Sequence, residues 1–378
     1  MDFTYDDEQQ ALRDAVRGLV GKKYADFENR RRTVADDPGF DEDLWKSLGE
    51  MGILGLPFDE EDGGSGAGPI EVGIVAQELG RVLAPEPFLT SVVLTGGLVA
   101  MTASDEQRTD VIGALSSGER VLAFAHHEPG SRWSTSARAV TATRNGDAWT
   151  LSGVKEPVIQ GARADQLVVS AALPDGGTGL FLVDGADSRR NGYATHDGGR
   201  AARVTFTDTP AVPLGEVTDR SAEIALVLDG SRIIAGNQAV GAMEVALQST
   251  TDYLKSRKQF GVTLNTFQAL NFRAADMYVA LELTTSIVAW ATMVLAEGTP
   301  DEVADAAARA SLQVSRGGRH VGQEAIQLHG GIGMTAEYAI GSYTSHLTAL
   351  DHLFGDGNHQ VGVLAGRVGS YDEVDPLA

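Results

Sequence analysis

Two segments of the chain combine residue types that suit a dinucleotide ligand. The first, at 257–261, reads Arg-Lys-Gln-Phe-Gly and is followed by Phe267-Gln268, and the second, at 327–333, reads Gln-Leu-His-Gly-Gly-Ile-Gly. An arginine offers a fork of N–H donors to a phosphate, and glycines let the backbone approach a ligand closely. Taken alone, Arg257 could be only the cation at a helix C-terminus, and the glycines only a helix stop. Together the two segments predict a site for a dinucleotide phosphate and adenine.

Other motifs point away from several chemistries. The glycine-rich stretch at 63–68 follows acidic residues instead of a strand and lacks the Lys-Ser or Lys-Thr of a phosphate loop, so we interpret it as a flexible loop. The histidines never adopt the His-Glu-x-x-His spacing, and the chain contains no cysteine. We therefore expect no metal site, no disulfide and no thiolate nucleophile.

Length and charge narrow the class of protein further. A chain of 378 residues is expected to form two or three packed subdomains, and 43% hydrophobic residues are enough to build their cores. The formal charge of −22, from 30 basic and 52 acidic residues, argues against nucleic acid or an anionic membrane as a partner. Residues 1–4 lack the features of a signal peptide. We expect a soluble, cytoplasmic protein.

The hydrophobic pattern divides the chain into three parts. Residues 1–118 carry apolar residues at helical spacing, and Ser104 to Gln107 forms a plausible capping box. At 119–215 short apolar runs alternate with Gly, Asp and Pro, and Asn145-Gly146 separates two of them as in a β-hairpin. At 216–378 long helical patterns return. The prediction is an α+β multidomain chain with an N-terminal helical domain, a middle antiparallel β domain and a C-terminal helical bundle.

The most apolar long window of the chain, at 279–297, is the strongest candidate for a membrane span. It contains Glu282, three threonines and a serine, which makes it too polar to cross a bilayer by this criterion. Its larger apolar residues recur at helical spacing, and they are Ile287, Trp290, Met293 and Val294. We therefore expect this window to be a buried helix of the bundle.

Over essentially its full length the chain resembles the acyl-CoA dehydrogenase family. The resemblance is carried by the segments at 44–57 and 78–85 and, more specifically, by the two segments described above. It implies a helical domain, a β domain and a four-helix bundle, assembled into tetramers in which each FAD lies across a subunit boundary. In the family, the bundle contacts the FAD of the neighbouring subunit. The matching positions in this chain are Arg257, Phe260, Gln268, Gln327, Gly330 and Gly331.

The other half of the cofactor site departs from the family pattern. Family members hold the flavin ring with a Thr-Glu-Pro-Gly-x-Gly-Ser-Asp loop and a Trp-[Ile/Val]-[Thr/Ser] strand. Here the loop at 127–134 reads His-Glu-Pro-Gly-Ser-Arg-Trp-Ser, and the strand at 155–161 reads Lys-Glu-Pro-Val-Ile-Gln-Gly. Arg132 and Trp133 replace a Gly-Ser pair where the family brings its backbone against the cofactor. Pro157 replaces a tryptophan and has no backbone N–H, and Ile159 replaces a Thr or Ser and has no hydroxyl.

The family's catalytic base has one matching position in this chain. Family members place a carboxylate, usually Glu, after the second segment, and the alignment puts Asp356 there. Asp356 is one methylene shorter than Glu, and it could instead be the aspartate of a turn. Some members place the base on the first bundle helix, where this chain has Ser231. Asp229 and Arg232 match the family's acyl-CoA-contacting Asp-x-x-Arg, although an i, i+3 ion pair is the simpler interpretation.

Our leading hypothesis is therefore a subunit of a heteromeric acyl-CoA dehydrogenase. This chain would supply the FAD-phosphate and adenine contacts, and a second acyl-CoA dehydrogenase subunit would supply the flavin-ring site and the base, in an α2β2 heterotetramer. The resemblance to paired-gene enzymes of actinobacterial steroid degradation suggests a sterol-derived acyl-CoA in lipid metabolism, with electrons passing to an electron-transferring flavoprotein. The alternatives are a self-sufficient homotetramer with Asp356 as base, a nitroalkane-oxidase-like flavoenzyme and a non-catalytic scaffold subunit.

Overall fold

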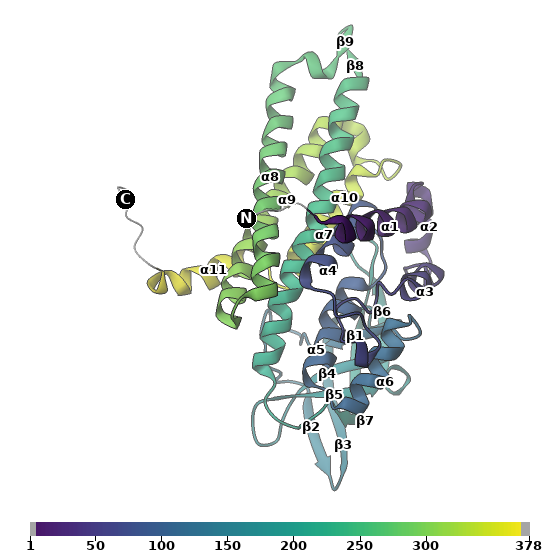
Figure 1. Cartoon of the computed structure of the whole chain (residues 1–378), viewed down its shortest axis with the longest axis vertical. Helices are drawn as coiled ribbons and strands as arrows, with labels where there is room; N and C mark the ends of the chain where they lie inside the picture. The colour runs from purple at the N-terminus through teal and green to yellow at the C-terminus, as the bar shows by residue number, and fades with distance from the viewer. Residues whose placement is uncertain (1–4, 372–378) are drawn as a thin grey trace.

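Helices form the first part of the chain, where apolar residues recur every three or four positions (Figure 1). The computed structural model describes residues 5–371, so residues 1–4, where no signal peptide is predicted, and the last seven residues of the predicted bundle domain lie outside it. The Ser104–Gln107 capping box is confirmed at the start of α6. The elements are α1 (Asp7–Tyr24), α2 (Phe27–Ala35), α3 (Glu42–Glu50), α4 (Pro69–Arg81), the π-helix η2 (Phe88–Gly96), α5 (Gly97–Thr102) and α6 (Asp105–Ser116).

The middle of the chain forms a seven-stranded sheet. The hairpin predicted at Asn145-Gly146 is confirmed, because Asn145 pairs with Ala148 across an antiparallel turn. The prediction of an antiparallel domain needs a correction, because β4 pairs in parallel with β1 and, at Thr141 and Ala172, with β2. The chain leaves β1 and returns to its side only after the β2–β3 hairpin. The strands are β1 (Leu122–Ala125), β2 (Thr141–Asn145), β3 (Ala148–Ile159), β4 (Gln166–Ala172), β5 (Thr178–Asp184), β6 (Arg189–Ala194) and β7 (Arg200–Pro213).

Strand pairing closes most of the sheet on itself. β4 pairs with both β2 and β5, and β3 and β7 complete a ring between those two strands. The ring encloses a core of its own that includes Leu151, Phe181 and Phe206. Closure leaves few free strand edges and makes this domain a firm support for the loops at its rim.

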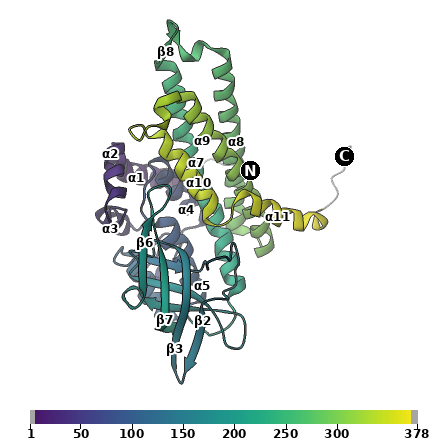
Figure 2. The ribbon, with the colours of Figure 1, turned by 180° about the vertical axis from the view of Figure 1, so that it is seen from behind.

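The last part of the chain is a bundle of long helices (Figure 2). The small β8–β9 hairpin lies at the far end of the bundle, away from the main sheet (Figure 1). The helices and the hairpin strands are α7 (Ser221–Ser256), β8 (Lys258–Gln259), β9 (Val262–Thr263), α8 (Gln268–Glu297), α9 (Pro300–His329), α10 (Ile340–Leu353) and α11 (Gly357–Arg367).

Helix α8 is covered on one side only, which corrects two expectations. By length and composition the whole helix is apolar enough to cross a membrane, whereas its 279–297 window alone is predicted to be too polar for a span. The helix packs on α7 and α9, yet only 28% of its most apolar window is buried. Its outer face carries the exposed side chains of Phe272, Tyr278, Val279 and Leu283. The helix predicted to be buried is therefore a bundle helix with one uncovered apolar face.

Two glycines let the helical domain dock against the bundle. Helices α4 and α7 cross so closely that only glycine fits at the crossing. A Cβ on Gly80 would lie 2.0 Å from the carbonyl oxygen of Gln238. A Cβ on Gly241 would lie 2.0 Å from the carbonyl oxygen of Gln77 in the opposite helix. This close crossing fixes α4, and the segment that follows it, against α7.

We predict that Gly241→Ala destabilises the protein by about 1–3 kcal/mol, because the added methyl group forces the two backbones apart. Gly18→Ala in α1 is the matched control. A Cβ there meets nothing within 4 Å, so the substitution should leave stability unchanged or raise it slightly. Chemical denaturation of both variants measures the difference, and equal stabilities would contradict the close crossing.

Candidate functional site

The residues predicted to contact a dinucleotide lie at one end of the bundle. Arg257 is the C-terminal cap of α7, and Gln268 begins α8. Gln327 lies in the last turn of α9, which Gly330 caps. The ends of α7 and α9 are held together by Tyr253 and His329, whose rings stack with centroids 4.6 Å apart. The Arg273 guanidinium on α8 makes a two-pronged ion pair with Glu324 on α9.

This end of the bundle presents its functional groups to the outside. Arg257, Gln268, Gln327, Gly330 and Gly331 are exposed, and Phe260 is 93% exposed. Within residues 5–371, the Arg257 guanidinium and the two glutamine amides make no hydrogen bond or ion pair. An exposed phenyl ring beside unpaired donors suits a ligand that another chain brings, and the donor set matches a dinucleotide phosphate and an adenine.

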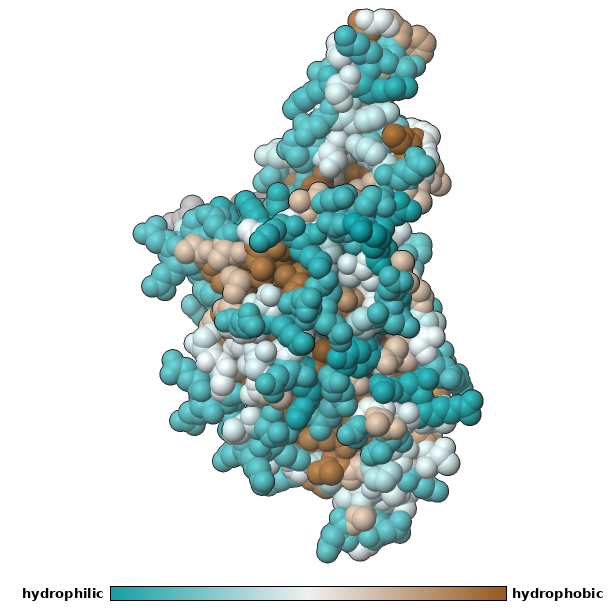
Figure 3. Space-filling model, turned by 90° about the vertical axis from the view of Figure 1, so that its right-hand side faces the viewer, coloured by the Kyte–Doolittle hydropathy of each residue, from teal (hydrophilic) through white to brown (hydrophobic). Residues whose placement is uncertain are grey.

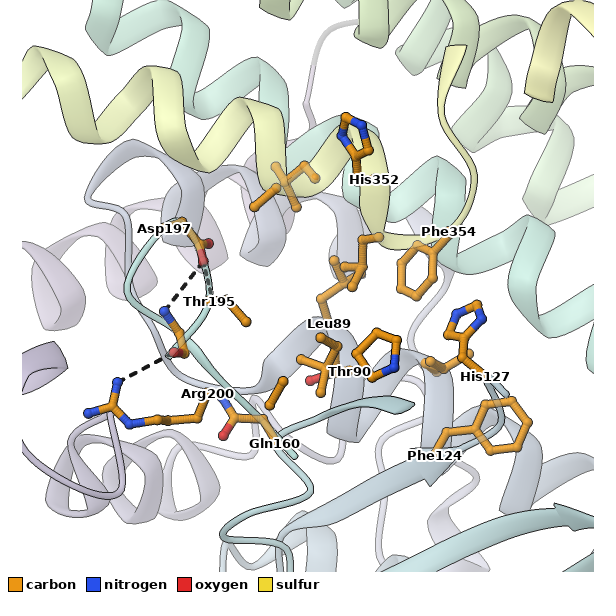
Figure 4. Close-up of a pocket in the computed structure, with 18 of the residues that line it drawn as sticks. Leu89, Thr90, Phe124, His127, Gln160, Thr195, Asp197, Arg200, His352 and Phe354 are labelled. Atoms are coloured by element: carbon orange, nitrogen blue, oxygen red, sulfur yellow. Dashed lines mark hydrogen bonds between the residues drawn. The ribbon is translucent and has the colours of Figure 1, made fainter. Parts of the chain in front are cut away.

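A separate cavity of about 550 Å³ lies between the sheet and the helices. Its walls come from the loop after β1, the end of β3, the β6–β7 turn, the segment between α4 and η2, and the last turns of α10. Figure 4 shows an aromatic end with Phe124, His127 and Phe354. Asp197, Thr195, Arg200 and Gln160 lie together at the opposite end.

Sequence reasoning did not find the polar end of the cavity. Buried Arg30 on α2 donates to the carbonyl oxygens of Leu83 (2.7 Å) and Asp197 (2.9 Å). The Asp197 carboxylate in turn contacts Nδ1 of His346 at 3.1 Å, and Glu86 lines the same region. Arg30 and Asp197 are 167 positions apart in the sequence, so they form no local motif and only the tertiary fold brings them together.

The loop that forms the aromatic wall is anchored by a buried lysine. Lys155 on β3 is fully buried, and its Nζ donates to the carbonyl oxygen of His126, to Glu128 and to the Ser170 hydroxyl, each at 2.9–3.0 Å. The Glu128 carboxylate also accepts the backbone N–H groups of Arg138, Ala139 and Val140. Every charge in this cluster is therefore compensated.

Burial shifts the pKa values of this cluster. Desolvation and the neighbouring Lys155 ammonium lower the pKa of His126 to about 3. Desolvation also lowers the pKa of Lys155 to about 8, although Glu128 acts in the opposite direction. Burial alone would raise the pKa of Glu128, but the backbone N–H donors and Lys155 bring it below its ordinary value. Neutral His126 accepts from Ser170 at Nδ1 and donates from Nε2 to the Ser134 carbonyl oxygen.

The side chains that depart from the family pattern lie on this same wall. Trp133 adopts a left-handed backbone conformation (φ 59°), and its ring lies between His127 and His359, with centroids 6.0 and 5.9 Å away. The pairing of β3 with β7 shifts register between Lys155 and Val158, where Pro157 has no N–H to donate. Pro157 and Ile159 both line the cavity, so the wall offers neither a tryptophan ring nor a hydroxyl at these positions.

Asp356 is placed away from this cavity. It is the N-cap of α11, and its Oδ1 accepts the backbone N–H of His359 at 2.9 Å. It lines a shallow hollow with Arg316 and Arg319, whereas Phe354 lines the cavity. Gly355 between them has φ 126°, and a Cβ there would lie 2.8 Å from the His359 ring. The turn therefore directs Phe354 inward and leaves Asp356 as a helix cap.

Asp229 and Arg232 form the ion pair expected from their spacing on α7. Arg232 also donates from Nε to the carbonyl oxygen of Phe354 at 2.9 Å. Burial raises the pKa of Asp229, while Arg232 opposes that shift. The pair lies beneath the α10–α11 turn and holds Phe354 in place; a contact with acyl-CoA stays a prediction.

We predict that acid destabilises the protein partly through His126. The pKa of the His126 imidazole is lower in the folded chain than its ordinary value of 6.5. Below pH 6.5 the imidazole is therefore protonated in the unfolded chain but stays neutral in the folded chain. Stability therefore falls as the pH falls from 6.5 toward 3. Between pH 7.5 and pH 5 this single group accounts for about 2 kcal/mol.

The variant His126→Gln tests this contribution. It should lose less stability than the natural protein between these pH values, as measured by urea denaturation. Burial also lowers the pKa values of His127 and His329, so part of the acid destabilisation remains in the variant. An identical pH dependence in both proteins would contradict the prediction.

Comparison with known proteins agrees with this architecture. Residues 6–119 and 223–369 match the family descriptions "Acyl-CoA dehydrogenase, N-terminal domain" and "Acyl-CoA dehydrogenase, C-terminal domain". The chain is 32% identical to the acyl-CoA dehydrogenase IpdE2 of Mycobacterium tuberculosis over 346 residues, which cover 90% of this chain and 91% of that protein.

Two solved structures share the whole fold. The Tcur3481–Tcur3483 steroid ACAD matches with a TM-score of 0.86 and 31% identity, covering 96% of this chain and 98% of that one. The ChsE4–ChsE5 complex from Mycobacterium tuberculosis matches with a TM-score of 0.88 and 26% identity, covering 99% and 100%. This chain therefore belongs to the acyl-CoA dehydrogenase family, whose enzymes are flavin-dependent oxidoreductases that act on a CH–CH bond.

Proposed function

We propose that this chain is one subunit of a heteromeric, FAD-dependent acyl-CoA dehydrogenase. In this proposal it contributes the FAD-phosphate and adenine contacts to a partner subunit that holds the flavin ring and the catalytic base. The observation that carries the proposal is the separation of two regions. The bundle end keeps Arg257, Gln268 and Gln327 exposed and unpaired, whereas the cavity wall has lost the family's flavin contacts.

The bundle end fits the phosphate and adenine parts of FAD. Arg257 can give two N–H donors to a phosphate oxygen, and Gln268 and Gln327 offer amides on neighbouring helix ends. Gly330 has φ 66°, and a Cβ at either Gly330 or Gly331 meets nothing within 4 Å, so this turn leaves room for a ligand against the backbone. FAD, when bound, would accept the hydride that leaves the β-carbon of the acyl thioester.

The cavity of the same chain does not fit the flavin ring. Trp133 fills the space between His127 and His359, where the family has a small residue that lets the backbone approach the cofactor. Pro157 gives no N–H, and the Ile159 side chain gives no hydroxyl. A flavin placed here would leave its polar edge without the donors that the family provides.

The uncovered face of α8 supports assembly with another chain. Exposed Phe272, Val279 and Leu283 follow one side of the helix, and exposed Phe260 and Met334 lie at the adjoining bundle end. Figure 3 shows this narrow end at the top of the molecule, with hydrophobic groups among hydrophilic ones. Contiguous exposed apolar residues mark an interface more often than a free surface. An interface here would bring the FAD contacts to the partner.

The substrate and the electron acceptor are part of the proposal. Two similar structures are complexes named by two components each, and one of them is called a steroid enzyme. These names support a bulky, steroid-derived acyl-CoA as the substrate class and an α2β2 assembly. We propose an electron-transferring flavoprotein as the acceptor.

Expression with and without the partner tests the division of the site. We expect the chain alone to be colourless or insoluble, because it lacks a complete flavin site. Co-expression with a second acyl-CoA dehydrogenase subunit from the same genome should give a yellow complex with one FAD for every two chains, measured by flavin absorbance and protein mass. Acyl-CoA oxidation is followed with a dye acceptor.

Other outcomes identify the alternatives. A yellow homotetramer with one FAD per chain contradicts the proposal and supports a self-sufficient enzyme. Nitroalkane oxidation with oxygen as acceptor, without acyl-CoA oxidation, identifies an oxidase. A flavin-containing complex whose FAD content is unchanged when this chain is removed identifies a scaffold subunit.

Asp356 provides a second prediction within the complex. Asp356→Asn keeps an N-cap oxygen and removes the carboxylate, so it should retain turnover within about twofold. Asp356→Ala loses the cap and should destabilise α11 by about 1 kcal/mol. If Asp356→Asn abolishes acyl-CoA oxidation while the complex and its FAD remain intact, the base lies in this chain after all.

A further inference from the structure

A buried histidine lies beneath the glycine turn at the bundle end. His329 ends α9 and is 3% exposed, whereas Gly330 and Gly331, which follow it, are exposed. The chain then folds back over the histidine, because a Cβ on Gly333 would lie 3.1 Å from the Cβ of His329. We call the turn at Gly330–Met334 closed in this arrangement, in which it covers His329.

The imidazole ring of His329 connects the turn to two other segments. It stacks on the Tyr253 ring of α7, with centroids 4.6 Å apart and the ring planes 29° from parallel. The Tyr338 ring, from the segment before α10, lies 5.0 Å from the same imidazole. The carbonyl oxygen of Tyr253 accepts the backbone N–H of Arg257 at 2.8 Å. The stack therefore fixes the turn relative to the arginine that is predicted to bind the FAD phosphate.

The hydrogen bonds of the ring define its neutral form. Nδ1 of His329 lies 2.7 Å from the carbonyl oxygen of Ala325, one helical turn earlier, and carries the proton that it donates there. Nε2 is then an acceptor, and this buried atom has no hydrogen-bond partner among residues 5–371. An unpaired buried acceptor destabilises a fold, so packing alone would favour an apolar ring at this position. The imidazole therefore indicates a role besides packing.

Within residues 5–371, no acidic side chain is placed to stabilise a proton on Nε2. Glu324 of α9 is paired with Arg273 of α8. Asp252 on α7 and Glu337 before α10 are exposed, and neither forms an ion pair with His329. The ring itself faces the two tyrosine rings. Burial accordingly lowers the pKa of His329, opposed by its hydrogen bond to the α9 backbone.

Acid therefore favours an open turn. Within the closed turn, a proton on the His329 ring would be a buried charge without a partner, which is costly. If the turn moves off the ring, water reaches the imidazole and its pKa returns to the ordinary value of 6.5. Below pH 6.5 the open form thus binds a proton that the closed form does not, and the closed fraction falls as the pH falls.

We propose that His329 is a positioning residue for the FAD contacts at the bundle end. Its neutral ring holds the turn closed and fixed relative to Arg257, and protonation of the ring opens the turn. This inference rests on the proposed function of the bundle end, and it adds a dependence of FAD binding on pH.

Hydrogen exchange tests the closure of the turn without FAD. The sample is the full-length protein in the assembly that it forms in solution, with its flavin removed. Between pH 7.5 and pH 5.5 the protection factors of the backbone amides at 330–334 should fall by about fivefold or more. His329→Phe keeps a ring for the stack but cannot take up a proton, so its protection factors should change by less than about twofold.

The comparison of the two proteins decides the role of the proton. An equal fall in both, or no fall in the natural protein, would overturn the proposal. His329→Leu also has a side chain that cannot be protonated, and it replaces His329→Phe if that variant does not fold.

FAD affinity connects the turn to the cofactor. At pH 7.5, His329→Ala should weaken FAD binding about tenfold, and His329→Phe should remain within about threefold of the natural complex. Ile233→Ala removes a fully buried side chain in the first half of α7, so it lowers stability as His329→Ala does but should leave FAD affinity unchanged. An equal loss of affinity in both alanine variants would show a structural role alone and would overturn the proposal.

Arg257→Ala separates failure of this inference from failure of the proposed function. If Arg257→Ala weakens FAD binding and His329→Ala does not, the positioning role is wrong and the proposed function stands. If neither variant weakens FAD binding, the bundle end does not hold the cofactor, and both are wrong.

Discussion

A fully buried lysine determines the shape of the β domain where it faces the helices. The Lys155 ammonium has Glu128, the His126 carbonyl oxygen and the Ser170 hydroxyl as acceptors, so it ties the loop after β1 to the middle of the sheet. Removing the Glu128 carboxylate would leave the ammonium charge uncompensated in an apolar core, which is among the costliest changes in a protein interior. The loop that carries His127 and Trp133 is therefore held in one position, where it forms one wall of the cavity.

Under the proposed division of function, this constraint would keep the family scaffold intact. Glu128 and Lys155 support the loop from behind and do not depend on which side chains the loop presents. Trp133, Pro157 and Ile159 could thus replace the flavin contacts without loss of the fold. The bundle end is structurally independent of this wall, because Arg257 and Gln327 belong to helix ends that are joined by the Tyr253–His329 stack. Because the bundle end and the cavity wall are independent, the cofactor contacts of the first could be kept while the flavin contacts of the second are lost.

Local patterns predicted most of the fold, because each element carries its own signal. The Ser104 cap, the Asn145-Gly146 turn and the long bundle helices all depend on neighbours in the sequence. The parallel pairing of β1 with β4 depends on a connection through a hairpin, and no local pattern encodes it.

The candidate site was predictable in part, and its limits have physical reasons. The six bundle-end positions lie in two recognisable segments, and the structure brings their helix ends together. The alignment of loops predicts Asp356 as the base, and only the structure shows that Phe354 lines the cavity while Asp356 caps α11, so the role of Asp356 stays a prediction. The polar end of the cavity joins Arg30, Asp197 and His346 from three distant elements, so tertiary structure alone reveals it.

In the proposed complex this chain gives its bundle end, and not its own cavity, to the cofactor. The FAD affinity of the purified complex with Arg257→Ala in this chain, compared with Lys258→Ala beside it, tests this role. We expect Arg257→Ala to weaken FAD binding by about tenfold or more without dissociating the complex, while Lys258→Ala has little effect. Unchanged FAD affinity in the Arg257→Ala complex would contradict it.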